Sequence, residues 1–425
     1  MHTAGTASDT ADFAVGLDDI CAAASTLAGQ VVRTPLIHAP RLSDMLGCEL
    51  YLKLENQQFT GSFKDRGSYV RLVNLTAEQK RTGVIAMSAG NHAQGVAYHA
   101  ARLGIPATIV MPLFAPFSKV ERTRSLGAQV VQAGESIDES RETANELMDR
   151  HGLTFVHPFD DPHVIAGQGT IGLELLDDQP ELDAVVVPIG GGGIMAGTAI
   201  AATALRPGIE MIGVEAALFA SMSESLKGQP ATSGRGGVSL ADGIAVKTPG
   251  KLTRPVIDKL VSEIALLDEG EIESSVSMLA EYQKIVAEGA GAAPLGAALQ
   301  LRERLAGRKV ALVICGGNID TRVLASVMMR GLVRDGRLVR LRVDITDAPG
   351  TLAKVSGLIG QKGGNIVEVY HQRLFHDVPV RRAEIDCVVE TRNPDHVREI
   401  VEVLNEGGFR TRMLSTLSQD GPTQF

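Results

Sequence analysis

The sequence predicts an α/β protein made of a large first part and a smaller second module. Short aliphatic runs alternate with helix-length segments from about residue 16 to residue 332. The 425 residues include 46 glycines but only 4% aromatic residues, a composition typical of tight turns between buried strands and helices. The pattern changes after the charged, Gly-bearing segment 334–337, which indicates a linker. We therefore expect one domain over residues 1–334 and another over residues 338–425.

The first part is predicted to form one or two mostly parallel sheets covered by helices. Its candidate strands are short and aliphatic, and Gly or Pro bounds many of them: residues 84–87, 107–111, 128–131, 184–187 and 310–314. Helix-length segments such as 139–150 and 274–287 lie between them. Ligands of such sheets bind at the carboxyl ends of the strands, so the residues that follow each strand are the candidate site.

The second module shows a different, alternating pattern. Apolar residues alternate with charged ones over residues 339–345, as in a half-buried strand. Further segments then predict a helix, two strands, a second helix and a closing strand: residues 352–359, 365–371, 383–389, 397–404 and 409–417. The order β-α-β-β-α-β is that of a small ferredoxin-like domain.

Composition excludes several classes of function. The net charge is −9 and the pI is about 5.6, whereas a nucleic-acid groove or a polybasic membrane anchor needs clustered positive charge. We expect no signal peptide and no membrane span, because no segment has the required apolar run. The four scattered cysteines form no CxxC pair, which disfavours disulfides and zinc and fits a reducing cytoplasm.

Two motifs near the start of the chain have residues suited to catalysis. Lys64 lies in the small-residue segment Gly61-Ser62-Phe63-Lys64, and a lysine can condense with a carbonyl to form a Schiff base. The segment Ser88-Ala89-Gly90-Asn91-His92 directly follows a predicted strand and opens a helix, where free backbone N–H groups can hold an anion. Taken singly, a solvated lysine and a simple helix cap are the more ordinary interpretations.

Two further motifs follow strands later in the chain. Gly190, Gly191, Gly192 and Gly193 are costly in chain entropy, and a phosphate cradled by backbone N–H groups would offset that cost. No Lys-Ser/Thr pair follows these glycines, as a P-loop requires, and no GxGxxG is followed about 20 residues later by a ribose-binding acid on a second strand, as dinucleotide binding requires. Cys315, before two glycines, is either inert packing or a thiol that faces a ligand. A candidate Schiff-base lysine and a phosphate cradle together fit pyridoxal phosphate.

These motifs, in this order, resemble those of the fold type II pyridoxal-phosphate enzymes, and within them the threonine/serine dehydratase group. The resemblance implies a two-lobed, tryptophan synthase beta-like catalytic domain whose small lobe spans roughly residues 55–158. It also implies that Lys64 forms the Schiff base and later acts as the base on the substrate Cα. The other implied contacts are Phe63 beside the cofactor, Asn91 on its ring hydroxyl, Gly190 to Gly193 on its phosphate, and Cys315 at its pyridine nitrogen.

The resemblance also implies a substrate site and the reaction. Ser88, Ala89, Gly90, Asn91 and His92 would receive the substrate carboxylate, and Glu288 would have a supporting role near the site. The implied reaction converts L-threonine to 2-oxobutanoate and ammonia, and L-serine to pyruvate. Serine dehydratase, serine racemase and hydroxyaspartate dehydratase stay open, as does a non-catalytic amino-acid sensor. Racemisation is disfavoured because Ala89 stands where racemases have a serine.

Two more implications concern metal and regulation. We expect no metal site, because the residues after Glu215 that would complete the family's cation site are Ala217, Phe219 and Ser221. The second module resembles an ACT domain, including the turn 347–352. That resemblance implies allosteric control, with isoleucine as inhibitor and valine as activator, and a homodimer or homotetramer. Pairing of ACT domains that serves oligomerisation alone is the alternative.

Overall fold

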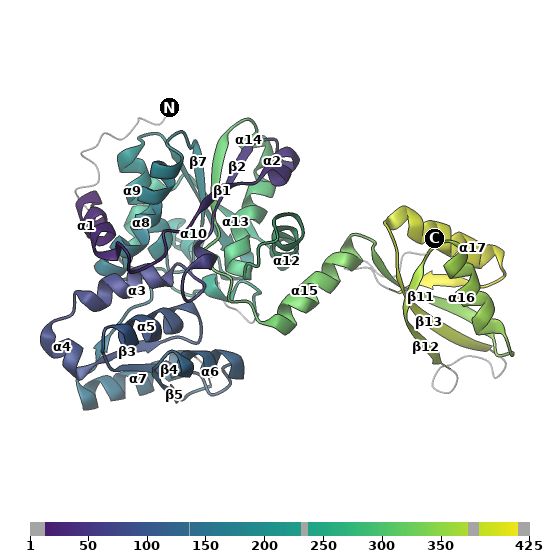
Figure 1. Ribbon diagram of the computed structural model, residues 1–425, viewed down its shortest axis with the longest axis horizontal. Coiled ribbons are helices and arrows are strands. Elements are labelled where there is room, and N and C mark those ends of the chain that lie inside the picture. Colours follow the sequence, from purple (N-terminus) through teal and green to yellow (C-terminus); the bar gives the residue numbers. More distant parts are fainter. Residues whose placement is uncertain (1–12, 136, 231–236, 373–381, 415–425) are drawn as a thin grey trace. The chain divides into compact units, whose positions relative to one another are not determined.

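The computed structural model describes residues 13–135, 137–230, 237–372 and 382–414 (Figure 1). By its contacts the chain divides into two compact units, Met1–Asp320 and Thr321–Phe425. This division falls at the start of helix α15 (Thr321–Arg334), ahead of the segment 334–337 that the sequence indicated as the linker. The reason is that α15 contacts strand β11 (Leu338–Thr346) of the second unit.

A six-stranded sheet forms the centre of the larger lobe of the first unit. Its strand order is β1-β2-β10-β7-β8-β9, and every neighbouring pair is parallel except β1 with β2. The strands are β1 (Leu36–His38), β2 (Glu49–Lys53), β7 (Ala184–Pro188), β8 (Glu210–Ala216), β9 (Glu263–Leu267) and β10 (Lys309–Val313). Because β7 and β10 are parallel neighbours, the glycine loop and Cys315 leave the sheet at the same edge.

Helices enclose this sheet (Figure 1). Helix α13 contacts strands β7 to β10, while α9 contacts β7 and packs against α8 and α11. The helices of this lobe are α1 (Leu17–Leu27), α2 (Pro40–Leu46), α8 (Pro162–Asp178), α9 (Gly193–Leu205), α10 (Ser221–Leu226), α11 (Thr253–Leu260), α12 (Glu269–Met278), α13 (Gly289–Gln300) and α14 (Arg302–Leu305). Short 3-10 turns are η1 (Glu55–Gln57), η2 (Ala217–Phe219) and η3 (Asp242–Ile244).

The helix predicted over residues 274–287 is wrong at its end. Helix α12 ends at Met278 and continues as the π-helical turn η4 (Leu279–Gln283). Lys284 then takes a left-handed backbone with φ of 60°, and Ile285 N donates to Leu279 O at 3.1 Å. This left-handed residue turns the chain out of the helix, which apolar spacing alone does not reveal.

A four-stranded parallel sheet forms the smaller lobe. Its order is β5-β4-β3-β6, with strands β3 (Val84–Met87), β4 (Ala107–Met111), β5 (Gln129–Gln132) and β6 (Thr154–Phe155). Val84 and Ala86 belong to the core that α5 fills, whereas Ile85 belongs to the core that α7 fills. The lobe's helices are α3 (Lys64–Val73), α4 (Ala77–Thr82), α5 (Asn91–Arg102), α6 (Phe117–Ser125) and α7 (Ile137–His151).

The second unit has the order β-α-β-β-α-β expected from its sequence. An antiparallel sheet, β12-β13-β11-β14, carries helices α16 (Thr351–Gln361) and α17 (Pro394–Glu406). Its other strands are β12 (Asn365–Gln372), β13 (Arg382–Glu390) and β14 (Thr411–Met413); residues 415–417 of the predicted last strand lie outside the described residues. Its core includes Leu341, Ile385 and Ile400.

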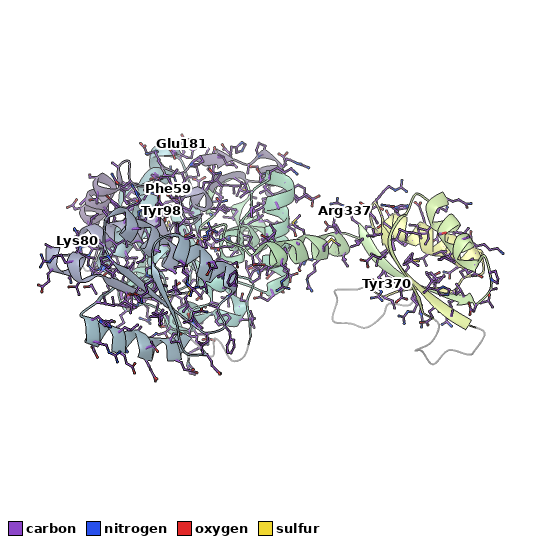
Figure 2. All side chains as sticks on the ribbon, turned by 60° about the horizontal axis from the view of Figure 1, so that its bottom comes forward. Phe59, Lys80, Tyr98, Glu181, Arg337 and Tyr370 are labelled. Carbon is purple, nitrogen blue, oxygen red and sulfur yellow. The ribbon has the colours of Figure 1, made fainter. Side chains whose placement is uncertain are left out.

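The sheet face of the second unit opposite this core carries ion pairs. Arg342 and Arg340 both donate to the carboxylate of Asp386, at 2.7 and 2.8 Å, and Arg342 and Arg412 pair with Glu384. The Arg340 guanidinium also lies 5.6 Å from the ring centre of Tyr370, which Figure 2 labels. Within the described residues, no helix combines the length and apolar character needed to cross a bilayer.

A buried ion cluster anchors helix α3 to the larger lobe. Arg66 donates to Glu55 at 2.7 Å and to Glu174 at 2.7 Å, and Lys53 donates to Glu174 at 2.6 Å. Arg66 is 1% exposed and Glu55 is fully buried. In the loop that precedes α3, the ring of Phe59 lies 5.6 Å from that of Tyr98 in α5, and both rings lie near the Arg102 guanidinium (Figure 2). Contacts of Arg66 after Lys64 and of Phe59 before it therefore hold this part of the chain.

We expect Arg66→Met to destabilise the first unit by about 3–5 kcal/mol, because it leaves the buried Glu55 carboxylate without its cation. The urea midpoint of the first unit measures this change. The matched control is Arg33→Met, since Arg33 is 53% exposed and its pair with Asp177 lies at the surface; its cost should stay below about 1 kcal/mol. Equal losses in the two variants would show that the cluster does not anchor the helix.

Candidate active site

A cavity of about 650 Å³ lies at the carboxyl ends of strands from both sheets of the first unit. Segments following β3, β7 and β10 all contribute to its wall. The cavity brings together every site residue that the sequence indicated: Phe63, Lys64, Ser88, Ala89, Gly90, Asn91, His92, Gly190, Gly191, Gly192, Gly193, Glu288 and Cys315. Motifs far apart in the chain therefore form one site.

Lys64 is the first residue of α3 and points its amine into this cavity. Its Nζ donates to the carbonyl oxygen of Pro158 at 2.7 Å and lies 4.9 Å from the centre of the Phe63 ring. Burial lowers the pKa of Lys64 to about 8, against the opposing effect of Cys315 and Glu288. A lysine with this pKa supplies free amine near neutral pH, as a nucleophile or base requires.

The loop before Lys64 is fixed to the neighbouring strand end. Asp65 accepts hydrogen bonds from Thr60 N at 2.9 Å and from Thr60 Oγ1 at 2.6 Å, which closes the loop on itself. Phe63 N donates to Cys315 O at 3.0 Å, and Gly317 N donates to Gly61 O at 2.9 Å. The lysine and the Cys315 segment therefore keep a fixed spacing.

The segment 88–92 forms another part of the cavity wall, lined by backbone N–H groups. Gly90 N donates to Ser88 Oγ at 3.1 Å, and α5 begins at Asn91, so the first N–H groups of this helix have no partner within it. His92 Nε2 binds Val156 O at 2.8 Å, and burial lowers the pKa of His92 to about 3. A neutral ring that donates to Val156 leaves the backbone N–H of His92, rather than its ring, to receive an anion.

Asn91 lies in a chain of side-chain hydrogen bonds. Its Nδ2 donates to Glu288 Oε1 at 2.6 Å, and its Oδ1 accepts from Asn318 Nδ2 at 2.7 Å. Burial, followed by the nearby Asp242 carboxylate, raises the pKa of Glu288 to about 7, although the Asn91 hydrogen bond acts in the opposite direction. Glu288 therefore titrates in the neutral range.

The glycine loop joins β7 to α9 and is shaped by close packing. Gly192 has φ of 97°, and a Cβ there would lie 2.7 Å from Thr253 Oγ1. A Cβ on Gly191 would lie 2.4 Å from the Phe159 ring, and Thr253 Oγ1 donates to Gly191 O at 2.6 Å. The loop leaves the N–H groups of the first turn of α9 without partners inside that helix, which suits a phosphate.

Cys315 completes the wall with a neutral thiol. It is 2% exposed, and burial, assisted by Glu288, raises the pKa of its thiol well above the usual value. A neutral thiol can face a heterocyclic nitrogen without supplying a negative charge. With a desolvated lysine and an anion cradle in the same cavity, the residues fit a phosphorylated aldehyde bound at Lys64.

The site is thus that of an enzyme working through a carbonyl cofactor, and comparison with known proteins agrees. The family model described as pyridoxal-phosphate dependent enzyme matches residues 27–316. The L-threonine ammonia-lyase of Thermotoga maritima is 46% identical over 400 residues, which cover 94% of this chain and all of that protein. The L-threonine ammonia-lyase of Geobacter sulfurreducens is 43% identical over 91% of this chain and 96% of its own.

Solved structures give the same result for the first unit. The processed form of threonine deaminase isoform 2 from Solanum lycopersicum matches with a TM-score of 0.71 and 34% identity, over 77% of this chain and 90% of that one. Maize serine racemase matches with a TM-score of 0.71 and 34% identity, over 76% and 99%. The chain belongs to the family of pyridoxal-phosphate dependent enzymes, and the predicted fold type II architecture is confirmed.

Asn318, Lys119 and Asp242 line the cavity, although the sequence indicated no role for them. Asn318 belongs to the Cys315-Gly316-Gly317-Asn318 motif, which was the available signal. Lys119, in α6, donates to Asp242, in η3, at 2.6 Å, so an ion pair joins the two lobes beside the cavity. Neither residue lies in a recognisable motif, and only the fold brings them together.

The carboxylate of Glu215 is held by backbone groups. Its two oxygens accept hydrogen bonds from Met222 N and Ser223 N, each at 2.9 Å. Burial raises the pKa of Glu215 to about 7. Among the residues that the structure describes, no three His, Cys, Asp or Glu side chains gather as a metal site would require.

We expect Asp242→Asn to lower the pKa of Glu288, because it removes a like charge and leaves the Lys119 ammonium unopposed. The measurement follows the infrared band of a protonated carboxylic acid as the pH is varied. The spectrum of each protein's Glu288→Gln derivative is subtracted, so that the difference reports Glu288 alone. The midpoint should lie near pH 7 in the wild type and at lower pH in Asp242→Asn.

The control for this measurement is Asp44→Asn, which removes an exposed carboxylate of helix α2. Its midpoint should equal that of the wild type. An unchanged midpoint in Asp242→Asn would show that Asp242 does not act on Glu288.

Proposed function

We propose that this protein is a pyridoxal-phosphate dependent threonine ammonia-lyase that converts L-threonine to 2-oxobutanoate and ammonia, and L-serine to pyruvate. The observation that carries the proposal is the desolvated Lys64 amine in one cavity with a four-glycine anion cradle and a neutral Cys315 thiol. The names of the relatives from Thermotoga maritima and Geobacter sulfurreducens support the substrate.

The bound cofactor supplies an electron sink for negative charge at the substrate Cα. Lys64 would hold the cofactor aldehyde through Nζ, and its free amine would accept the Cα proton of the substrate. Its pKa of about 8 makes both roles feasible near neutral pH. Loss of the Cα proton and of the β-hydroxyl together removes one water, and one water added at the nitrogen-bearing carbon releases ammonia and the 2-oxo acid.

The walls of the cavity orient the two ligands for this reaction. Gly190 to Gly193 would hold the phosphate through N–H groups, with Phe63 beside the ring and Asn91 at its hydroxyl. The segment Ser88 to His92 would receive the substrate carboxylate through backbone N–H groups and the Ser88 hydroxyl. Cys315 provides no negative charge to keep the ring nitrogen protonated, so prompt loss of the β-hydroxyl is favoured over return of the proton.

The nature of residue 89 favours elimination over racemisation. A racemase needs an acid on the face of Cα opposite the lysine, and Ala89 has no proton to give. Serine dehydratase and hydroxyaspartate dehydratase use the same elimination and differ only in the β-substituent. A non-catalytic amino-acid sensor would have no need of the desolvated Lys64 amine.

A substrate panel with Lys64→Ala tests this function. Wild-type protein should form 2-oxobutanoate from L-threonine and pyruvate from L-serine, with little D-serine from L-serine and little oxo acid from 3-hydroxyaspartate. Lys64→Ala should lose at least 10³-fold in rate, on the order expected when a covalent and proton-transfer group is removed, and also the visible absorbance of the bound cofactor. Wild-type protein that binds pyridoxal phosphate but yields no oxo acid would refute the proposal.

We also propose that the second unit is an ACT domain that regulates the first. The β-α-β-β-α-β order and the turn before α16 support this assignment. Isoleucine is the proposed inhibitor and valine the activator, within a homodimer or homotetramer. The four unpaired cysteines are consistent with the cytoplasmic location expected from the sequence.

The regulatory proposal predicts that L-isoleucine raises the threonine concentration needed for half-maximal rate, and that L-valine opposes it, because each ligand favours a different state. Initial rates of the full chain at varied threonine measure this effect. Gly350 has φ of 84° at the start of α16, so Gly350→Val should distort the turn and abolish the response while leaving the rate at saturating threonine unchanged. An isoleucine effect that survives in Gly350→Val would place the effector site elsewhere.

A further inference from the structure

We propose that Asn318 is a positioning residue that fixes which way the Asn91 amide faces, and through it controls the proton on Glu288. Its role in catalysis rests on the proposed function, whereas the coupling itself can be measured without any substrate. The chain of contacts begins at a backbone carbonyl and ends at Glu288.

The Asn318 amide has one orientation available to it. Its Nδ2 donates to Thr60 O at 2.8 Å and to Asn91 Oδ1 at 2.7 Å, which uses both of its hydrogens. Thr60 O is a backbone carbonyl and can only accept. The nitrogen of Asn318 must therefore face Thr60 and, with it, Asn91.

This constraint passes to Asn91. Since Asn91 Oδ1 accepts from Asn318, its Nδ2 must point the other way, and it donates to Glu288 Oε1 at 2.6 Å. Without the hydrogen bond from Asn318, the Asn91 amide could rotate by about 180° and present its oxygen to a protonated Glu288 instead. Asn318 thus selects the orientation in which Asn91 donates, and donation favours the ionised form of Glu288.

The backbone around Asn318 is shaped to hold this amide. A Cβ on Gly61, whose φ is 76°, would lie 2.7 Å from Asn318 Oδ1, so the amide packs directly on the glycine of the lysine loop. Glu288 N also donates to Gly316 O at 3.1 Å. Asn318 consequently contacts both the loop before α3 and the start of α5. The chain segment that contains Asn318 is itself hydrogen-bonded to the start of α13.

The charged groups that act on Glu288 come from several elements. Asp242 raises its pKa and Lys119 lowers it. Glu288 in turn acts on Lys64 and on Cys315, raising the pKa of both. A change in the proton on Glu288 therefore reaches the lysine and the thiol, although Asn318 has no hydrogen bond to either side chain within the described residues.

The test is Asn318→Asp, a substitution of the same shape that replaces the donor by a second acceptor. It should rotate the Asn91 amide and raise the pH midpoint of Glu288 titration above that of the wild type. This midpoint is measured from the infrared difference between each protein and its Glu288→Gln derivative. The substitution should also lower kcat for threonine on the order of 10- to 100-fold, the loss typical of removing an outer partner of a site residue, with a smaller change in KM. Asn318→Ala, which adds no charge, should shift the midpoint in the same direction.

Two comparisons separate coupling from general damage. Asn56→Asp makes the same chemical change in a neighbouring amide that donates to Val286 O at 3.0 Å, and it should leave the midpoint unchanged. In an Asn91→Ala background, Asn318→Ala should no longer shift the midpoint, because the connecting amide is gone.

An unchanged Glu288 midpoint in both Asn318 variants would overturn the proposal, and so would an equal shift in the Asn91→Ala background. The infrared midpoint needs no turnover. A wild-type protein inactive on threonine would therefore refute the proposed function and leave this coupling to be judged on its own.

Discussion

The anchoring of helix α3 is the constraint on which the catalytic unit depends. The first turn of this helix holds Lys64, Asp65 and Arg66 in succession, so the reactive amine follows wherever the next two side chains are fixed. Asp65 closes the preceding loop on Thr60, and Arg66 is bound to the buried Glu55 and Glu174. A buried cation with two carboxylates has few alternative positions, because each alternative leaves a charge unpaired in a dry interior.

The anchored helix places Lys64 in a cavity where burial from water sets the pKa values of the ionisable groups. The same burial that lowers the pKa of Lys64 raises those of Glu288 and Cys315, so the three groups approach neutrality together. The negative charge of a bound ligand then meets backbone N–H groups of the glycine loop and of the start of α5. Dipoles that are fixed by the fold need no reorganisation when charge develops.

Much of this site could be predicted because its motifs follow strands directly. Asn91, Gly190 and Cys315 each stand within four residues of the end of a strand, and the carboxyl ends of parallel strands lie at one edge of a sheet, whereas Lys64 follows β2 only after a longer loop. Lys119 and Asp242 could not be predicted, since each lies in an unremarkable segment and only the approach of the lobes pairs them. The direction of the His92 ring depends on a carbonyl 64 residues away. The π-helical end of α12 depends on the left-handed backbone of Lys284, which apolar spacing does not encode.

Two glycines of the loop between β7 and α9 are constrained by their protein neighbours. At Gly192 the positive φ and the contact with Thr253 disfavour any side chain, and at Gly191 the Phe159 ring does so. These constraints come from the protein and not from a ligand. Packing within the protein therefore favours glycine at both positions, whether or not a cofactor is bound. Gly191 and Gly192 are thus constrained by the fold itself, and their presence alone does not identify a working enzyme, whereas the Lys64 amine is the group that the reaction requires.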